Sequence, residues 1–553
     1  MDLAELIAGL QAVRSPMPSG AVRICDITED SRTVVPGSLF IARRGAKADG
    51  KNFIEQAATA GAAAILTDDV SLTSPKGFKL PIVFAADVPL VCAQLAERFY
   101  GYPTNHLKLS GVTGTNGKST TTYLIWQLMN KAKARCGLIG TVVVDDGAEV
   151  AAAAMTTPPS VELSRSFAMM IEAGCTAATL EVSSHALDQR RVDALRFQTA
   201  IFTNLTGDHL DYHKTMGAYA AAKARLFELL GPEATAIINS DDPHAARMIE
   251  NCKARVLRCA LNAAPNEADP ALPDECRATV LDAAMSGMSI AMEGPWGVIE
   301  AQVPLIGRYN AMNVLQAVAA CFASGLSREQ LCQGLPTLSA PPGRLERIST
   351  PRDDITVFVD YAHSDDSLMN CLESVAQLIP GRSHAGAIIR NAAGSSRPSP
   401  LPARNDRSTT GRLWVVFGCG GDKDKTKRPR MGAAAASIAD VVVITNDNPR
   451  TERPGDIVDD ILGGIAPEHR EKATVQIDRG RAIRHAIESA QPGDVVILAG
   501  KGHETDQILP DGAGGTITVH FDDREVGAAC LEQRRSTLAE SLKPSPGAAL
   551  RDL

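Results

Sequence analysis

The sequence predicts an α/β protein built from three domains, and three observations lead to that prediction. The chain has 553 residues, which allows three or four domains at about 150 residues each. Hydrophobic residues make up 44% of the chain, enough for several packed cores and too many for a disordered chain. Short apolar runs of strand length alternate with helical patterns, as in parallel sheets covered by helices.

The first domain is expected over residues 1–103, and a Gly-Tyr-Pro turn marks its end. Residues 63–67 and 81–84 are short apolar runs of the kind that form buried strands. Residues 52–60 and 88–99 have helical patterns. We therefore predict a small α/β domain here.

The second domain is expected over residues 104–340. It opens with a strand at 107–112, a glycine-rich turn and a helix from about 119 to 134. Later β-rich runs end in polar residues, and open α/β sheets bind ligands at the carboxyl ends of their strands. These runs are residues 137–140, 176–182 and 199–203.

The third domain is expected over residues 341–542, as a second parallel sheet of the doubly wound, Rossmann-like kind. Residues 381–411 interrupt it with a segment rich in Ser, Pro, Arg and Asn, whose composition predicts a flexible surface excursion. Residues 543–553 predict a flexible tail for the same reason. The strand-like runs are residues 355–359, 413–417, 440–445 and 494–499.

Composition excludes several classes of function. The 56 Lys and Arg residues against 64 Asp and Glu give a net charge of −8, and aromatic residues make up only 4%. Without a basic excess or stacking platforms, we expect no nucleic-acid partner. No apolar run reaches the roughly 18 residues of a membrane span, and the first residues lack signal-peptide features, so we expect a cytoplasmic protein. The 12 cysteines include no Cys-x-x-Cys pair, which favours reduced thiols over disulfides or zinc.

The strongest motif is GVTGTNGKST at residues 111–120, between a predicted strand and a predicted helix. Its glycines let backbone N–H groups close around phosphates, Lys118 can reach the β/γ-phosphates, and Ser119 can bind Mg²⁺. Val112 occupies the position of the first glycine in the strict pattern, and a plain glycine-rich turn is the alternative. The residues assigned to a nucleotide are Gly114, Thr115, Asn116, Gly117, Lys118, Ser119 and Thr120.

Three further residues have two interpretations each when taken alone. Glu181 ends a predicted strand, where a carboxylate suits Mg²⁺ and equally suits an ion pair with an arginine. His209 and His213 have the spacing of a helical zinc pair, but no third ligand follows at suitable spacing, so we predict no zinc site. Lys223 by itself has the pattern of a helix-surface lysine.

Taken together, the motifs resemble the Mur ligase family, ATP-dependent ligases that build the peptide stem of peptidoglycan. The matching phrases follow the family order and span nearly the whole chain. Within the family they are similar to the ligase that adds meso-2,6-diaminopimelate to UDP-MurNAc-L-Ala-D-Glu through an acyl phosphate. The phrases are GVTGTNGKST, EVSSHALDQRRV, FTNLTGDHLDYH, AAKARLF, GRYNAMN, PPGRLE, VDYAH, GCGGDKDKTKRP, TNDNPRTE and LAGKGHE.

The resemblance implies a UDP-binding first domain, a central ATP-binding P-loop domain and a third domain that brings the amino acid and closes over the site. It makes Lys118, Glu181, His209 and Lys223 catalytic, with Mg²⁺ bound by Ser119, Glu181, His209 and a carbamylated Lys223 (N6-carboxylysine). A desolvated lysine can be neutral and capture CO₂, and the resulting anion faces Mg²⁺ where an ammonium would repel it. Further ATP contacts are implied for Asn310, Arg344 and Asp360.

For the UDP-sugar peptide, the resemblance implies contacts from the first two domains. Arg191 suits this role chemically, because a guanidinium binds carboxylate or phosphate. Thr156 and Thr157, which precede two prolines, are equally compatible with a plain loop. The uridine-diphosphate residues are Ser31, Ala46, Lys47 and Ala48, and those for the muramoyl-dipeptide are Thr156, Thr157, Ser183, Gln189 and Arg191.

The resemblance implies that Asp447-Asn448-Pro449-Arg450 is the motif by which the family selects diaminopimelate instead of lysine as the added amino acid. Taken alone, these four residues are typical of a common turn. Arg450 would bind the distal carboxylate, and Gly500 and Glu504 are further contacts, Glu504 suiting the distal ammonium. Two positions depart from the family. Lys423 replaces an arginine and loses its planar fork, and Ser-Asp-Asp at 364–366 replaces Thr-Pro-Asp.

We expect only small-molecule partners for this chain, ATP, UDP-MurNAc-L-Ala-D-Glu and meso-diaminopimelate, with no membrane insertion and a monomeric state. The alternatives within the class are a lysine-adding Mur ligase and a folylpolyglutamate-synthase-like ligase. The alternatives outside it are a P-loop kinase or NTPase and a non-catalytic scaffold.

Overall fold

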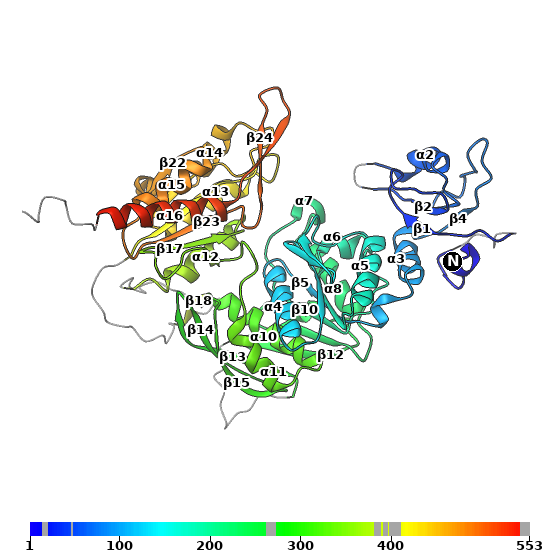
Figure 1. Cartoon of the computed structure of the whole chain (residues 1–553), viewed down its shortest axis with the longest axis horizontal. Helices are drawn as coiled ribbons and strands as arrows, with labels where there is room; N and C mark the ends of the chain where they lie inside the picture. The colour runs from blue at the N-terminus through cyan, green and yellow to red at the C-terminus, as the bar shows by residue number, and fades with distance from the viewer. Residues whose placement is uncertain are drawn as a thin grey trace, which may run out of the picture. The chain divides into compact units, whose positions relative to one another are not determined.

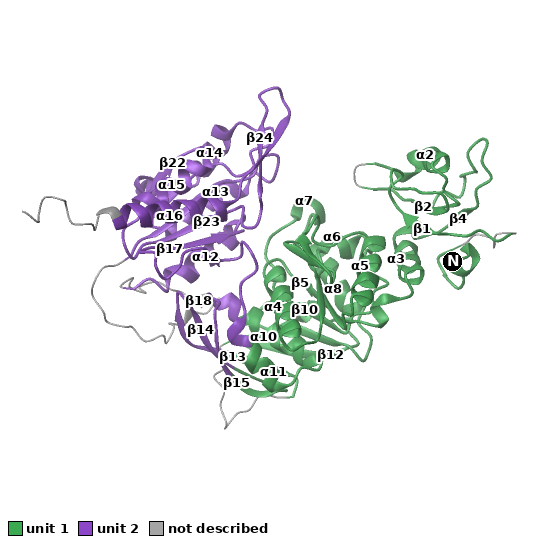
Figure 2. Cartoon of the chain, viewed as in Figure 1, with its two compact units in different colours: residues 1–278, 292–299, 312–334 green, residues 279–291, 300–311, 335–553 purple. Residues whose placement is uncertain are grey.

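The computed structural model describes residues 1–13, 20–45, 48–261, 273–380, 389–390, 396–397 and 411–541. Nearly all of the predicted excursion at 381–411, the predicted tail, and Ala46 and Lys47 lie outside the described residues. The chain separates into two compact units (Figure 2). Unit 1 is residues 1–278, 292–299 and 312–334, and unit 2 is residues 279–291, 300–311 and 335–553.

Unit 1 begins with a small parallel sheet whose strands follow the order β1-β2-β3-β4 (Figure 1). One buried cluster joins α1 and α3 to this sheet, and a second cluster includes residues of α2. The predicted strands and helices of this stretch are confirmed. The elements are α1 (Leu3–Ile7), β1 (Asp26–Thr28), β2 (Ser38–Ala42), a 3₁₀ turn (Gly50–Phe53), α2 (Ile54–Thr59), β3 (Ala64–Thr67), β4 (Ile82–Phe84), α3 (Val88–Phe99) and a second 3₁₀ turn (Pro103–Asn105).

The larger sheet of unit 1 has the parallel order β12-β11-β10-β5-β9-β6, extended by the antiparallel strands β7 and β8. Strand β5 (Lys108–Thr113) lies between β9 (Ala177–Glu181) and β10 (Thr199–Phe202). The carboxyl end of β5 is therefore where ligands bind in such sheets, and the helix α4 (Lys118–Lys131) starts there. Helix α8 (Met216–Glu228) is capped by Thr215 and carries the predicted Lys223.

The remaining described elements between residues 136 and 337 are listed here in chain order. They are β6 (Cys136–Ile139), β7 (Val143–Asp145), β8 (Val150–Ala152), α5 (Ser160–Glu172), α6 (Ser184–Asp188), α7 (Leu210–His213), β11 (Thr235–Asn239), α9 (Ala245–Met248), β12 (Arg255–Leu261), β13 (Glu275–Ala284), β14 (Gly287–Gly294), β15 (Gly297–Val303), α10 (Arg308–Ala323), α11 (Arg328–Gly334) and a 3₁₀ turn (Leu335–Thr337).

Unit 2 contains the predicted doubly wound sheet, in the order β16-β17-β23-β20-β21-β22 and parallel except at β16. Helices α12, α13 and α14 pack on one core, and α15 and α16 pack on another. The elements are β16 (Glu346–Arg347), β17 (Thr356–Asp360), α12 (Asp365–Ala376), β18 (Ile389–Arg390), β19 (Ser396–Arg397), β20 (Leu413–Phe417), α13 (Lys427–Ile438), β21 (Val441–Ile444), α14 (Pro454–Gly463), a 3₁₀ turn (Pro467–Lys472), β22 (Ala473–Val475), α15 (Arg479–Ser489), β23 (Val495–Ala499), β24 (Asp506–Pro510), β25 (Thr516–His520) and α16 (Asp523–Ser541).

The α/β fold class is therefore confirmed, and so are the predicted strands of the second and third stretches. The first predicted domain falls within unit 1, and so does most of the second, but residues 279–291, 300–311 and 335–340 belong to unit 2. The division near residue 103 stays a prediction. Within the described residues, no helix is both long and apolar enough to cross a bilayer.

Candidate active site

The glycine-rich loop between β5 and α4 has a backbone that only glycine fits. Gly114 has φ +151°, and a Cβ there would lie 1.9 Å from the Thr203 hydroxyl oxygen. Gly117 has φ +85°, and a Cβ there would lie 2.7 Å from Oδ1 of Asn313. Close approach of backbone to neighbouring elements is the geometry that a phosphate-binding loop needs.

Neighbouring groups from the end of β10 fix the loop. The Asn204 side chain accepts from the Asn116 N–H at 2.9 Å and donates to the Asn116 carbonyl at 3.1 Å. The Lys118 ammonium folds back over the loop and donates to the carbonyls of Gly114 and Thr115, at 3.0 and 2.9 Å. Thr120 is buried in the first turn of α4. The structure thus brings the predicted loop residues together at the carboxyl edge of the sheet.

Lys223 is buried, with only 1% of the residue exposed, so its interpretation as a helix-surface lysine is wrong. Its Nζ donates to the Gly114 carbonyl at 2.7 Å and lies 4.6 Å from the centroid of the Tyr219 ring. Burial lowers the pKa of Lys223 well below its usual value, and the positive charge of Lys118 lowers it further. A lysine in this position can hold a neutral, nucleophilic amine.

Glu181, the last residue of β9, is a buried carboxylate without a cation beside it. It accepts hydrogen bonds from the Ser119 hydroxyl at 3.0 Å and from the Thr141 amide and hydroxyl at 2.7 and 3.0 Å. Across the described parts of the chain it forms no ion pair, so the alternative arginine partner is absent. Neutral donors alone do not balance a buried charge, and this residue fits a bound cation.

His209 lies in a loop near a group of aromatic rings, with φ +53°. Its ring centroid is 5.0 Å from that of His185, and burial lowers the pKa of His209 to about 4, which favours the neutral, metal-binding form. His213 points elsewhere, since its Nε2 lies 3.0 Å from the Ser184 hydroxyl. Among the residues that the structure describes, no three His, Cys, Asp or Glu side chains gather as a metal cluster.

The predicted muramoyl-dipeptide residues come together at the start of α6. The Thr157 hydroxyl donates to the Glu181 carbonyl at 2.7 Å and accepts from the Ser183 amide at 3.0 Å. Arg191 donates to the Thr157 carbonyl at 2.6 Å and to the Gln189 side chain at 2.8 Å. The Thr156 hydroxyl accepts from that of Thr141 at 3.0 Å. The two threonines therefore belong to a fixed network and not to a plain loop.

Arg191 has no carboxylate partner within the described residues. Burial is the main reason that the pKa of Arg191 is lowered, and the positive charge of the nearby Arg43 lowers it further. A half-buried guanidinium held beside another cation favours a bound anion, because only an anion relieves both costs.

The predicted uridine-diphosphate residues are only partly described. Ser31 is buried, and its hydroxyl donates to the Gln56 side chain at 2.9 Å. The Ala48 carbonyl accepts from the Gly45 amide at 2.8 Å, while Ala46 and Lys47 between them lie outside the described residues. Their role stays a prediction.

In unit 2, the remaining predicted ATP residues lie on β17, in the first turn of α10 and, for Arg344, just before β16. Asp360 ends β17 and accepts from the amides of Leu345 and Ala362 at 2.6 and 2.8 Å. Burial raises the pKa of Asp360 to about 6, against the opposing effect of Arg344. The Arg344 guanidinium lies 4.4 Å from the centroid of the Tyr361 ring. Asn310, in the first turn of α10, is buried and donates to the Ile306 carbonyl at 2.8 Å.

The predicted amino-acid residues gather at the carboxyl ends of β21 and β23. The Asn448 amide donates to the Glu504 carboxylate at 2.8 Å, and Arg450, with φ +53°, donates to the Gly421 carbonyl at 2.7 Å. A Cβ at Gly500 would lie 2.8 Å from the carboxylate of the buried Asp447, which explains the glycine.

Two cations of this site have no carboxylate partner in the part of the chain that the structure describes. Arg450 donates only to backbone carbonyls, at Gly421 and Asn448. Lys423 is exposed. Pro449 holds the turn against the neighbouring loop, since a Cβ at Gly421 would meet the Pro449 carbonyl oxygen at 1.9 Å. Arg450 and Lys423 therefore present positive charge that no carboxylate of the described residues pairs with.

Several residues of these networks escaped the sequence interpretation. Thr141 binds Glu181, Tyr219 lies beside Lys223, and Lys501 and Gln507 contact the amino-acid loop. Only Tyr219 had a sequence signal, because it precedes Lys223 by four residues on one helix face. The others lie in loops or in a hairpin whose partners are set by folding.

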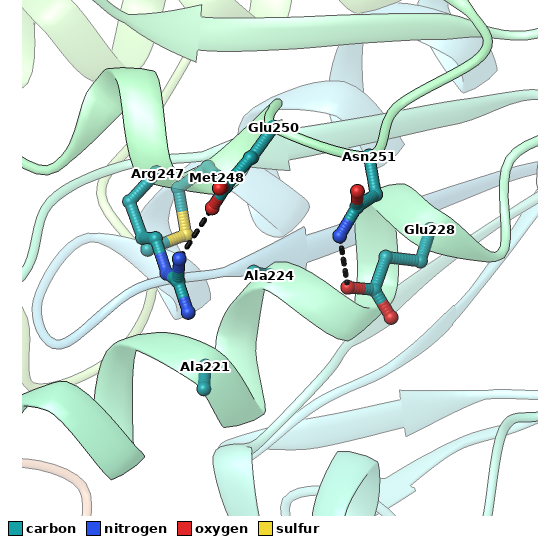
Figure 3. Close-up of a pocket in the computed structure, with 7 residues that line it drawn as sticks. All are labelled: Ala221, Ala224, Glu228, Arg247, Met248, Glu250 and Asn251. Carbon is teal, nitrogen blue, oxygen red and sulfur yellow. Dashed lines mark hydrogen bonds and ion pairs between the residues drawn. The ribbon is translucent and has the colours of Figure 1, made fainter.

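A pocket on the outer face of α8 is separate from this chemistry (Figure 3). None of its lining residues is a predicted site residue. A second pocket includes Met155 and Pro158, which flank the two threonines of the dipeptide network. The first is lined by Ala221, Ala224, Glu228, Arg247, Met248, Glu250 and Asn251.

Comparison with protein families accounts for this arrangement. Three family models match the chain: the Mur ligase family catalytic domain at residues 23–100, the Mur ligase middle domain at 112–321, and the Mur ligase glutamate ligase domain at 402–502. The chain is also 40% identical, over 97% of its length and 99% of the relative's, to a UDP-N-acetylmuramoyl-L-alanyl-D-glutamate--2,6-diaminopimelate ligase of Gloeobacter violaceus. The chain belongs to the Mur ligase family.

Other relatives of this Mur ligase agree. A ligase of the same name from Geobacillus thermodenitrificans is 39% identical over 95% of this chain and 100% of its own. A solved structure of a ligase of that name superposes with a TM-score of 0.64 and 29% identity, over 97% of this chain and 99% of the other. The Thermotoga maritima MurF ligase in complex with ADP shares the fold, with a TM-score of 0.56 and 15% identity over 94% and 98% of the two chains.

Proposed function

We propose that this Mur ligase uses ATP to add meso-2,6-diaminopimelate to UDP-MurNAc-L-Ala-D-Glu, giving ADP, phosphate and the UDP-MurNAc-tripeptide of peptidoglycan synthesis. Full-length relatives with that printed activity support the reaction. The observation that carries the choice of amino acid is Arg450, a guanidinium without a carboxylate partner in the described residues, held by the carbonyls of Gly421 and Asn448. Diaminopimelate has the distal carboxylate that such a group binds, and lysine lacks it.

Amide formation needs an activated carboxylate, and ATP supplies the activation. The γ-phosphoryl group passes to the acceptor carboxylate to give an acyl phosphate. The amine then attacks the acyl carbon, and phosphate leaves with the former carboxylate oxygen. Both steps bring anions together, so the protein contributes cations and precise positions.

Lys118 and the loop at 114–117 bind the phosphates of ATP in this scheme. The Lys118 ammonium donates to two loop carbonyls, and it exchanges these for phosphate oxygens when the nucleotide enters. The first turn of α4 adds the positive end of the helix dipole.

The residues around Glu181 fit a divalent cation, as the buried carboxylate without a counterion indicates. Ser119 and Glu181 would hold Mg²⁺, with His209 and a carbamylated Lys223 as further ligands, and the ion would neutralise charge on the phosphates. The buried Lys223 amine forms the carbamate by attacking CO₂ and releasing one proton. The neutral amine thereby becomes an anion beside the nucleotide loop.

Arg191, Thr157 and Ser183 orient the acceptor peptide. They form one network that includes the Glu181 backbone, so the peptide and the phosphate-binding residues are placed by the same strand end. Ser31 and residues 46–48 are proposed to bind the uridine diphosphate. The reaction uses ATP, so we place it in the cytoplasm, and we propose a monomer.

The test is ADP release in the presence of ATP, Mg²⁺ and UDP-MurNAc-L-Ala-D-Glu. We expect turnover with meso-diaminopimelate and far slower turnover with L-lysine or L-ornithine. Equal rates with lysine would identify a lysine-adding ligase. ADP release that ignores the amino acid would contradict the ligase mechanism and favour a P-loop NTPase.

A further inference from the structure

Lys501, in the loop after β23, is a fully buried lysine to which no role is assigned above. The residue is 0% exposed. Its ammonium lies 3.2 Å from a Glu504 carboxylate oxygen and 3.4 Å from Oδ1 of Asn448, and it also donates to the Asp506 carbonyl. Three acceptors from three segments thus surround one buried cation.

These contacts use the full donor capacity of the ammonium. A lysine has three N–H donors, and three acceptors are in place. A buried ammonium with unused donors would be costly, so this arrangement ties the loop at 447–450, the loop at 500–504 and the start of β24 to one point.

The same contacts fix which way the Asn448 amide points. Its Oδ1 accepts from Lys501 and from the Ile508 amide at 3.0 Å, while its Nδ2 donates to Glu504 at 2.8 Å. A flipped amide would direct its NH₂ group at an ammonium and an N–H. The orientation that donates to Glu504 is therefore the stable one.

Glu504 is contacted by both Lys501 and Asn448, and its side chain is still partly exposed to solvent. Its side chain is 33% exposed, and its carboxylate is held by Lys501 and Asn448, with Tyr361 as a further neighbour. Gln507 supports the neighbouring backbone, because its buried amide donates to the Asp447 carbonyl at 2.7 Å.

We propose that Lys501 is a positioning residue for the amino-acid substrate, whose buried ammonium sets the orientation of Asn448 and Glu504 and so the selection of diaminopimelate. The proposal rests on the function proposed above. Lys501 itself contacts no substrate. It acts through Asn448 and through Glu504, the proposed partner of the distal ammonium, while Arg450 binds the distal carboxylate.

The test compares Lys501→Met with the wild-type enzyme, because methionine keeps an unbranched apolar stem and removes the charge. We expect the KM for meso-diaminopimelate to rise at least tenfold, while the KM values for ATP and UDP-MurNAc-L-Ala-D-Glu change less than twofold. The ratio of kcat/KM for diaminopimelate over lysine should fall as well. An unchanged KM for diaminopimelate would overturn the proposal, and so would an equal rise for all three substrates.

Arg534→Met is the matched control. Arg534 pairs with Asp354, just before the amino end of β17 and thus at the opposite edge of the same sheet. Its side chain is 11% exposed, so this variant also removes a mostly buried, paired cation. We expect lower thermal stability with unchanged KM values. If the control raised the KM for diaminopimelate as much as Lys501→Met, general destabilisation would explain both.

Lys501→Arg keeps the inference testable if the methionine variant fails to fold. A planar guanidinium keeps the charge but cannot direct hydrogen bonds to the same three acceptors. We expect at least a threefold rise confined to the KM for diaminopimelate, and wild-type kinetics would overturn the proposal. Failure of the proposed function is distinct, since the wild-type enzyme would then release no ADP in response to diaminopimelate.

Discussion

Two buried lysines, one in each compact unit, show how differently the same side chain is held. Lys223 in unit 1 is 1% exposed and Lys501 in unit 2 is 0% exposed. Lys223 has one carbonyl acceptor, which it shares with Lys118, and an aromatic ring beside it. Lys501 has a carboxylate, an amide oxygen and a carbonyl.

The difference lies in the partners, because burial is the same. Desolvation disfavours the ammonium of Lys223, and a second cation disfavours it further, so its surroundings favour loss of the proton. The surroundings of Lys501 offer an acceptor to each of its three donors, and one of these acceptors is a carboxylate. These surroundings match the two proposals, covalent modification of Lys223 and positioning of its neighbours by Lys501.

The largest effect is expected from Lys223→Ala. We predict that kcat/KM falls roughly 10²–10³-fold, the range for removing one preorganised electrostatic group, and that added bicarbonate does not restore it. Steady-state ADP release measures this loss. Lys131→Ala, which removes an exposed lysine from the last turn of α4, should retain normal activity. Near-normal rates for Lys223→Ala would remove the proposed contrast between the two lysines.

A smaller effect is expected from Glu181→Gln, which keeps the shape and removes the charge. We predict a loss of about 10–100-fold in metal affinity or activity, as for residues that hold or orient a metal. Titrating Mg²⁺ in the ADP-release assay measures it, and saturating Mg²⁺ should recover part of the rate. The control is Glu172→Gln, at the exposed end of α5. An unchanged Mg²⁺ requirement would show that Glu181 does not bind the metal. It would also weaken the proposal that a carbamylated Lys223 binds Mg²⁺ together with Glu181.

The smallest effect is expected from Arg450→Lys. The charge remains, but the planar fork for a carboxylate is lost, so we predict a rise of about tenfold in the KM for meso-diaminopimelate, equal to about 1.4 kcal/mol. The KM for ATP should not change. Arg453→Lys, an exposed neighbour, is the control. If Arg450→Lys were silent while Lys501→Met was not, selection would depend on Asn448 and Glu504 alone.

Much of the fold followed from local patterns. The strand at 413–417 and the helix at 88–99 match β20 and α3 residue for residue, because apolar runs and caps act over a few neighbours. The phosphate-binding loop was equally local, since its glycines and the helix start are contiguous. The roles of Lys223 and Arg450 came from the resemblance of longer phrases and not from periodicity.

The burial of single side chains and the identity of their partners could not be predicted from local patterns. The sequence determined the α/β class, the nucleotide loop and the family, because these depend on adjacent residues and on ordered motifs. Only the tertiary structure decided that Lys223 is buried beside Lys118, that Glu181 has no ion-pair partner among the described residues, and that Lys501 joins Asn448 to Glu504. Desolvation and charge pairing depend on which distant segments meet, and no short stretch of sequence encodes that meeting.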